Sequence, residues 1–177
     1  QFVNGFQLEE AVNGCYGHRL HFWDLRKRKN IQTVDLGKEY QMVLELRPAH
    51  NPIETYGFAS VVLNTTDLSS SIWTWFNEQG KWQVKKIIDI PAQPAHEDDL
   101  PPALKQFKAV PPLVTDINLS LDDKFLYVSC WGTGDMIQYD VSDPFQPKEV
   151  GRVRIGGIVS RATHPKASNG ALNGGPQ

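Results

Sequence analysis

The sequence predicts an all-β fold, a partial β-propeller of about two and a half to three four-stranded blades. Three observations lead to this prediction. Apolar and polar residues alternate along many short segments, turn residues separate these segments, and a pattern of strands recurs about every fifty residues. The 14 glycines and 12 prolines among 177 residues also favour many turns and few long helices.

The alternation is clearest where apolar side chains occupy every second position. Met42, Leu44 and Leu46 share one face of their segment, which is typical of a strand with one buried side. Helical spacing occurs only in residues 8–12 and 103–108, and both are short for an isolated helix. Strands are therefore predicted for residues 19–25, 31–36, 42–46, 57–63, 71–76, 82–90, 114–119, 125–131, 136–141 and 150–155.

Three of the predicted hairpins resemble one another and define an internal repeat. Each has an aromatic residue on its first strand, at Trp23, Trp75 and Tyr139, and ends its second strand with an aliphatic-x-aliphatic triplet followed by Gly or Pro. Further strand pairs follow the first two hairpins. Four strands in about fifty residues correspond to one propeller blade, so the chain would hold half a blade, two whole blades and the beginning of a fourth. A β-sandwich is the main alternative, but it explains the repeat less well.

The domain organisation follows from the spacing of the repeat. The second interval is longer than the first because of residues 92–112, a proline-rich inserted loop that contains five prolines. Residues 1–177 are otherwise interpreted as a single partial propeller domain. The chain begins with Gln1 and ends in turn residues, so we expect an internal piece of a longer protein. Alone, such a piece leaves blade faces uncovered and should fold poorly or associate.

Charge and composition exclude several functional classes. Lys and Arg number 18 against 20 Asp and Glu, which gives no basic surface for nucleic acid or anionic lipid. The basic run 26–29 is interpreted as a solvated hairpin tip. No apolar run is long enough to span a membrane. Cys15 and Cys130 are too few for a disulfide scaffold, and we expect a cytoplasmic protein, or a periplasmic one if a preceding segment carries a signal.

His50 is the best candidate for a metal ligand. It lies in the rigid sequence Pro-Ala-His-Asn-Pro, just after a strand predicted to be innermost in its blade. Loops at that position reach the propeller axis, where ligands from separate blades can converge. The alternative is a turn histidine that binds nearby backbone. No His-x-His or His-x-x-x-His pair supports a local metal motif, and no catalytic residue is identified.

The remaining chemically active residues have structural interpretations. Asp116 and Asp135 lie near turns, where they would bind backbone amides and only secondarily a cation. Asp side chains in the turn 120–124 can bind their own backbone. Cys130 is predicted to be a buried, inert thiol. The other histidines are assigned to surface, packing or solvated loop positions, and the tryptophans to blade packing; these residues are His18, His21, His96, His164, Trp23, Trp73, Trp75, Trp82 and Trp131.

Several motifs, taken in order along nearly the whole chain, resemble the selenium-binding protein family, which includes methanethiol oxidase. They are Gly5-Phe6, Tyr16-Gly17, Trp23-Asp24, His50-Asn51-Pro52, Tyr56-Gly57-Phe58, Thr115-Asp116-Ile117, Leu119-Ser120-Leu121-Asp122-Asp123, Tyr127-Val128-Ser129-Cys130-Trp131, Gln138-Tyr139-Asp140-Val141-Ser142-Asp143-Pro144 and Gly174-Gly175-Pro176-Gln177. The resemblance implies a β-propeller and the middle of a protein more than twice this length.

The resemblance also implies an activity, the oxidation of methanethiol by oxygen and water to formaldehyde, hydrogen sulfide and hydrogen peroxide. It implies copper held by histidines, and His50 matches a family histidine; the cysteine linked to selenium binding would precede Gln1. A non-catalytic selenium-binding or carrier protein and an interaction scaffold are the alternatives. This chain has Gly132, Thr133 and Ile137 where many members have Leu, His and Arg, which would alter activity if that His or Arg binds metal or substrate.

Overall fold

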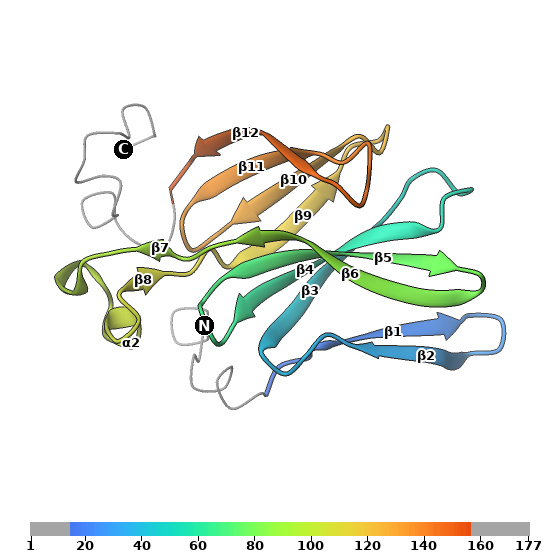
Figure 1. Ribbon diagram of the computed structural model, residues 1–177, viewed down its shortest axis with the longest axis horizontal. Coiled ribbons are helices and arrows are strands. Elements are labelled where there is room, and N and C mark those ends of the chain that lie inside the picture. Colours follow the sequence, from blue (N-terminus) through green and yellow to red (C-terminus); the bar gives the residue numbers. More distant parts are fainter. Residues whose placement is uncertain (1–14, 157–177) are drawn as a thin grey trace.

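The computed structural model describes residues 15–156, which form antiparallel sheets and short turns (Figure 1). Two four-stranded sheets, ordered β3-β4-β5-β6 and β9-β10-β11-β12, follow a two-stranded sheet, β1-β2. A two-stranded ribbon, β7-β8, lies in the connection between the two larger sheets. The strands are β1 (Arg19–Asp24), β2 (Lys29–Asp35), β3 (Tyr40–Pro48), β4 (Tyr56–Asn64), β5 (Ser70–Glu78), β6 (Lys81–Ile90), β7 (Gln93–Pro94), β8 (Ala109–Val110), β9 (Val114–Leu119), β10 (Phe125–Cys130), β11 (Asp135–Asp140) and β12 (Lys148–Arg154).

This arrangement confirms the all-β prediction and the half blade followed by two whole blades. The aromatic positions of the repeat lie on successive sheets, Trp23 on β1, Trp75 on β5 and Tyr139 on β11, and not in one two-layer stack. The sandwich alternative is therefore wrong. The beginning of a fourth blade, and the helical spacing in residues 8–12, lie outside the described residues.

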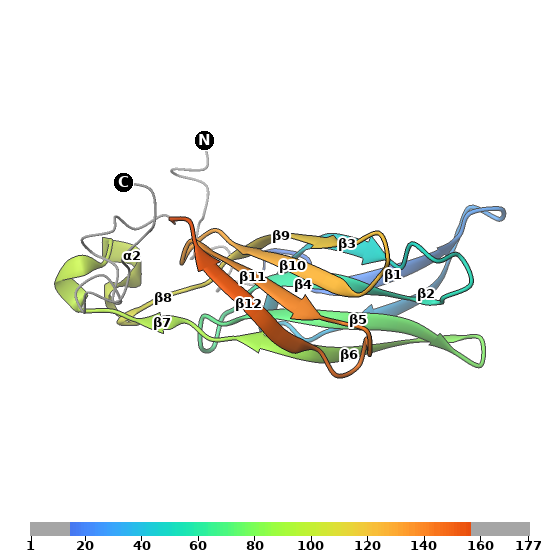
Figure 2. The same ribbon diagram turned by 90° about the horizontal axis from the view of Figure 1, so that it is seen from above.

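The sheets pack face to face in succession, as propeller blades do. One buried cluster joins Phe58 and Ile72 of the first large sheet to Ile117, Leu126 and Ile137 of the second. Another joins the half blade to the β3–β6 sheet through buried aliphatic residues and partly buried aromatic ones. The two larger sheets contact one another most closely at their first strands, β3 and β9, which lie side by side (Figures 1 and 2). β3 and β9 are therefore the inner strands.

The outer hairpins carry a repeated irregularity that the sequence pattern does not reveal. The pairing register shifts beside an aromatic residue in each of them, at Phe22/Trp23, Ile72/Trp73 and Gln138/Tyr139. Each shift leaves one extra residue on the outermost strand, which is the signature of a β-bulge and increases local twist. A bulge at related positions of three hairpins supports the structural repeat independently of side-chain identity.

The turns between second and third strands also repeat. The N–H of Leu68 donates to the carbonyl of Asn64 at 2.9 Å, and the N–H of Gly134 donates to the carbonyl of Cys130 at 2.7 Å. Both donors have positive φ, 61° for Leu68 and 76° for Gly134. The two blades thus share one turn geometry although one turn has glycine and the other leucine.

Residues 92–112 contain more structure than a loop. Besides β7 and β8 they form a 3-10 helix, η1 (Glu97–Asp99), and a helix, α2 (Pro102–Lys105). The apolar residues Leu100, Leu104 and Val110 pack against Leu63 and Leu68 of the neighbouring blade. No helix in the described part of the chain is long and apolar enough to cross a membrane.

Candidate functional site

Two loops that follow the inner strands meet at one end of the blades. One links β3 to β4 and carries His50; the other links β9 to β10 and carries Asp123. The two residues are 73 positions apart in sequence and belong to different blades. Because successive blades repeat the same connections, equivalent loops lie next to one another at this end of the sheets.

The Asp123 carboxylate receives three hydrogen bonds from the His50 loop. Its Oδ1 lies 2.8 Å from the backbone nitrogen of His50 and 2.8 Å from Nδ1 of the His50 ring. Its Oδ2 accepts from the backbone N–H of Asn51 at 2.9 Å. One carboxylate therefore fixes both the backbone and the imidazole of the His50 loop.

The hydrogen bonds of this pair determine the charge of Asp123 and the tautomer of His50. Burial raises the pKa of Asp123, but the hydrogen bonds from His50 and Asn51 outweigh it, and the pKa lies below its usual value. An ionised carboxylate only accepts hydrogen bonds, so Nδ1 of His50 must carry the proton. In the neutral ring the lone pair is then on Nε2, which has no hydrogen-bond partner among residues 15–156. The His50 side chain is 42% exposed, whereas that of Asp123 is 12% exposed.

This geometry fits one ligand of a metal site. Histidine ligands commonly donate their second ring N–H to a carboxylate, which fixes the tautomer and raises the basicity of the ligating nitrogen. Within residues 15–156, however, no group of three or more His, Cys, Asp or Glu side chains could hold a metal ion. A complete site would need ligands from elsewhere in the protein, and the role of His50 stays a prediction.

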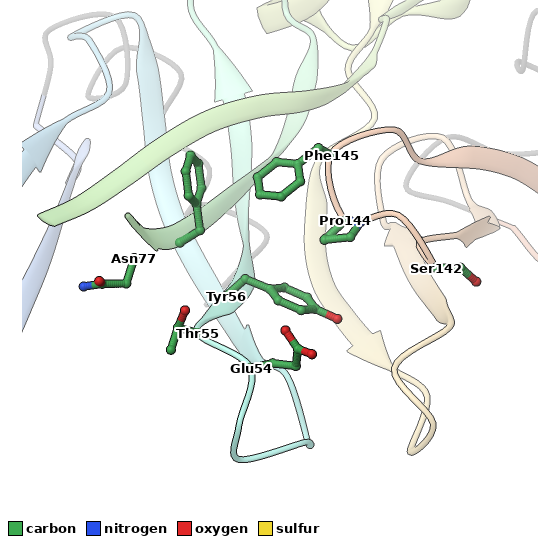
Figure 3. Close-up of a pocket in the computed structure, with 8 residues that line it drawn as sticks. Glu54, Thr55, Tyr56, Asn77, Ser142, Pro144 and Phe145 are labelled. Atoms are coloured by element: carbon green, nitrogen blue, oxygen red, sulfur yellow. The ribbon is translucent and has the colours of Figure 1, made fainter. Parts of the chain in front are cut away.

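A pocket of about 320 Å³ opens between the two larger sheets near this loop (Figure 3). Figure 3 shows Glu54 and Tyr56 on one side of it, with Pro144 and Phe145 opposite. Burial, together with the charges of Asp123 and Glu54, raises the pKa of Tyr56, so its hydroxyl stays protonated. The eight residues that line the pocket are Glu54, Thr55, Tyr56, Phe76, Asn77, Ser142, Pro144 and Phe145.

The two other carboxylates considered from the sequence bind side chains, where backbone amides were expected. Asp116 pairs with Arg47 across the β3–β9 contact at 3.2 Å and accepts from Asn118. Asp135 is buried and lies 3.4 Å from the Arg152 guanidinium, and it accepts a hydrogen bond from Gln93 at 3.1 Å. Both carboxylates therefore have structural partners of opposite charge.

Cys130 and the histidines His18, His21 and His96 have the structural roles expected of them. Cys130 is buried, and desolvation raises the pKa of its thiol to about 12, so it stays protonated; Cys15 is exposed. His18 and His21 bind Asp35 and Thr33 within the half blade. His96 accepts a hydrogen bond at the start of η1. His164 lies outside the described residues.

Three tryptophans pack where the half blade meets the next sheet, as predicted. Trp82 stacks on Phe22 with ring centroids 4.7 Å apart, Trp75 meets both rings edge-on, and Trp73 packs edge-on against Tyr40. Trp23 is 56% exposed and Trp131 is 41% exposed in this chain, which spans about a third of the length of its relatives, so their role in blade packing stays a prediction.

The residues that depart from the family pattern lie away from His50. Thr133 is buried in the turn after β10, whereas Asp123 precedes the same strand, so the six residues of β10 place them about 20 Å apart. Ile137 is fully buried in the main core. Gly132 lies close to the backbone at the end of the inserted segment. A Cβ at this position would lie 2.1 Å from the carbonyl oxygen of Pro111, so a larger residue does not fit without a backbone shift.

Sequence reasoning identified His50 but missed Asp123, which was expected to bind the backbone of its own turn. Asp122 does so by accepting from the backbone N–H of Lys124, and it also accepts from the Ser120 hydroxyl, whereas the Asp123 carboxylate binds the loop of the neighbouring blade. The signal that would have revealed it is the repeat itself. His50 and Asp123 occupy corresponding connections of adjacent blades, and such connections are neighbours in a propeller.

Comparisons with known proteins agree with this architecture. A family model described as "56kDa selenium binding protein" matches residues 1–177. A methanethiol oxidase of Xenopus tropicalis is 40% identical over 161 residues, covering 90% of this chain and 32% of that protein. Selenium-binding protein 2 of Mus musculus is 38% identical over 161 residues, covering 90% and 31%.

Solved structures extend the comparison to three dimensions. The X-ray structure of a hypothetical selenium-binding protein from Sulfolobus tokodaii is 60% identical, with a TM-score of 0.79 over 85% of this chain and 33% of that one. A proposed 6-phosphogluconolactonase from Bacteroides uniformis is 13% identical with a TM-score of 0.51, which is a likeness of fold alone. The chain spans about a third of the length of the relatives it matches.

Proposed function

Because this chain belongs to the 56kDa selenium binding protein family, we propose that the complete protein is a copper-dependent methanethiol oxidase to which His50 contributes a metal ligand. In the reaction, methanethiol, oxygen and water give formaldehyde, hydrogen sulfide and hydrogen peroxide. Methanethiol loses two electrons, and oxygen gains them with two protons. Copper, when bound, supplies the redox step that no side chain of this chain can perform.

One observation carries the proposal: His50 lies beside the inner strands with Nδ1 held by a carboxylate and Nε2 left to accept a metal. Imidazole nitrogen suits copper. The position also matters, because loops after the inner strands are the ones that ligands from other blades can approach. A small thiol is the substrate class that the names of the relatives support. We further propose a cytoplasmic location, since both cysteines are free thiols.

The test uses the full-length protein with His50→Ala and a matched control, His18→Ala. Both histidines pair with an aspartate at 2.8 Å, but His18 lies on the half blade and binds Asp35. Copper measured by elemental analysis should fall in His50→Ala and stay unchanged in His18→Ala. Equal copper content in the two variants would remove His50 from the ligand set.

The name of the murine relative favours a second candidate, a selenium-binding or carrier protein without turnover. The two functions differ in their products. Methanethiol-dependent release of peroxide and sulfide by the wild type supports the oxidase, whereas retention of selenium without either product supports the carrier.

A further inference from the structure

We infer that Asp123 is a positioning residue that orients His50 across the blade interface and selects the tautomer able to bind metal. This inference rests on the proposed metal role of His50. It goes beyond that role because the orienting group comes from a different blade. The orientation and tautomer of the His50 ring therefore depend on how two blades pack together.

The first step of the argument is the fixed position of the carboxylate. Two backbone N–H groups, those of His50 and Asn51, donate to different oxygens of Asp123 at 2.8 and 2.9 Å. These bonds hold the carboxylate in one orientation, with Oδ1 directed at the ring. The carboxylate is largely buried, so little water competes for it.

The second step is the choice of tautomer. A fixed carboxylate 2.8 Å from Nδ1 accepts the ring proton and stabilises the Nδ1–H form. The opposite tautomer would place the Nδ1 lone pair against a negative oxygen. Nε2 is thereby kept as the free lone pair, on an exposed side of the ring, where a metal held by other blades can reach it.

The third step is the backbone at Asp123, whose φ is 59°. The left-handed region is unfavourable for most residues with a side chain, although aspartate tolerates it better than most. Glycine adopts this conformation without that penalty. An aspartate that keeps this conformation while bound to a histidine of another blade is consistent with a role for its carboxylate.

The experiment compares Asp123→Asn and Asp123→Gly with Asp35→Asn in the full-length protein. Asp123→Asn keeps the shape but removes the charge. Asp123→Gly removes the carboxylate while suiting the positive φ, so it remains informative if Asp123→Asn folds poorly. Asp35→Asn is the matched control, because Asp35 holds Nδ1 of His18 at the same 2.8 Å distance.

The first readout needs no metal. With ¹⁵N-labelled histidine, NMR should show the Nδ1–H form for His50 in the wild type and in Asp35→Asn. Both Asp123 variants should shift His50 toward the Nε2–H form. A wild-type His50 with its proton on Nε2, or a tautomer that is unchanged in both Asp123 variants, overturns the inference.

The second readout is the affinity for Cu(II), followed by titration and by the nitrogen splittings in the electron paramagnetic resonance spectrum. Loss of an orienting partner typically lowers metal affinity about 10- to 100-fold, and we expect that decrease in both Asp123 variants. Unchanged affinity in both, with a decrease in His50→Ala, overturns the inference and leaves the proposed function intact. Unchanged affinity in His50→Ala itself overturns the metal role and the inference together.

Discussion

Replacing Gly132 by alanine should destabilise the protein although it adds one methyl group. The new Cβ would lie 2.1 Å from the Pro111 carbonyl oxygen and 3.0 Å from that of Pro112. In a close-packed interior the backbone segments must then separate by about 1 Å to restore ordinary contact. Two hydrogen bonds cross this contact, from the N–H of Gly132 to Pro112 at 2.8 Å and from the N–H of Trp131 to Leu113 at 3.0 Å.

The magnitude follows from these contacts. Overpacking costs about 1–3 kcal/mol, and each hydrogen bond that is lost costs about 0.5–1.5 kcal/mol, so we expect about 2–6 kcal/mol in total. Gly151→Ala is the matched control on the same sheet. Its Cβ would meet Gln138 at an ordinary 3.6 Å. Because glycine is unfavourable inside a strand, this control should be neutral or stabilising by up to about 1 kcal/mol.

Urea unfolding of the full-length variants measures the free-energy difference, and limited trypsin digestion tests its location. The inserted segment carries Lys105 and Lys108, so displacement of Pro111 and Pro112 should expose it to faster cleavage in Gly132→Ala than in Gly151→Ala. Stabilities within 0.5 kcal/mol of one another, with equal cleavage rates, would show that residues 111–113 do not run against the Gly132 turn.

Two further predictions concern titratable groups. Iodoacetamide at pH 8, followed by peptide mass spectrometry, should label Cys15 in the native full-length protein but not Cys130, whose buried thiol has its pKa raised to about 12; rapid native labelling of Cys130 would contradict its burial. The Gly37 backbone amide, with Arg19 and His18, lowers the pKa of Asp35 well below its usual value of 3.8. This carboxylate therefore stabilises the fold above pH 3.8 and loses that effect as the pH falls further. The difference in urea midpoint between the wild type and Asp35→Asn should therefore shrink as the pH falls below about 4, and a difference that grows on this acidification would contradict the sign.

The strands could be predicted from the sequence because each one carries its own signal. Alternation and turn residues are local, so the predicted 71–76 and 82–90 correspond to β5 and β6 within a few residues. The order of the sheets followed from the repeat, which is also visible in the sequence. The bulges and the positive φ of Leu68 could not be predicted, because they arise from packing between strands and leave no trace in residue type.

The segment 92–112 shows where local signals mislead. Five prolines indicate an irregular loop, yet Pro102 occupies the start of a short helix, where proline is well tolerated. Leu100 and Leu104 then pack against the neighbouring blade and give the segment its own apolar contact. Proline content predicted the absence of long elements, whereas the helical spacing at residues 103–108 marked the place of the short helix α2.

Of the two residues of the candidate site, the sequence indicated His50 but not Asp123. His50 stands out because its residue type and its rigid context are local features. Asp123 is one of two adjacent aspartates in a turn, and only the neighbouring blade distinguishes them. Such partners become visible only when corresponding connections of adjacent blades are compared with one another.

The residues that pack the blades together differ from the residues of the candidate site. The blades are held by buried clusters and by rings such as Phe22 and Trp82, and a protein with 13% identity shares the architecture, so the fold does not define the chemistry. The His50 ring contributes little to that core, since it is 42% exposed. The Asp123 backbone has a positive φ, and within residues 15–156 its carboxylate binds only the loop that carries His50. The three hydrogen bonds between Asp123 and the His50 loop fix an exposed imidazole at the contact of two blades, and this is where we expect function to depend on side-chain identity.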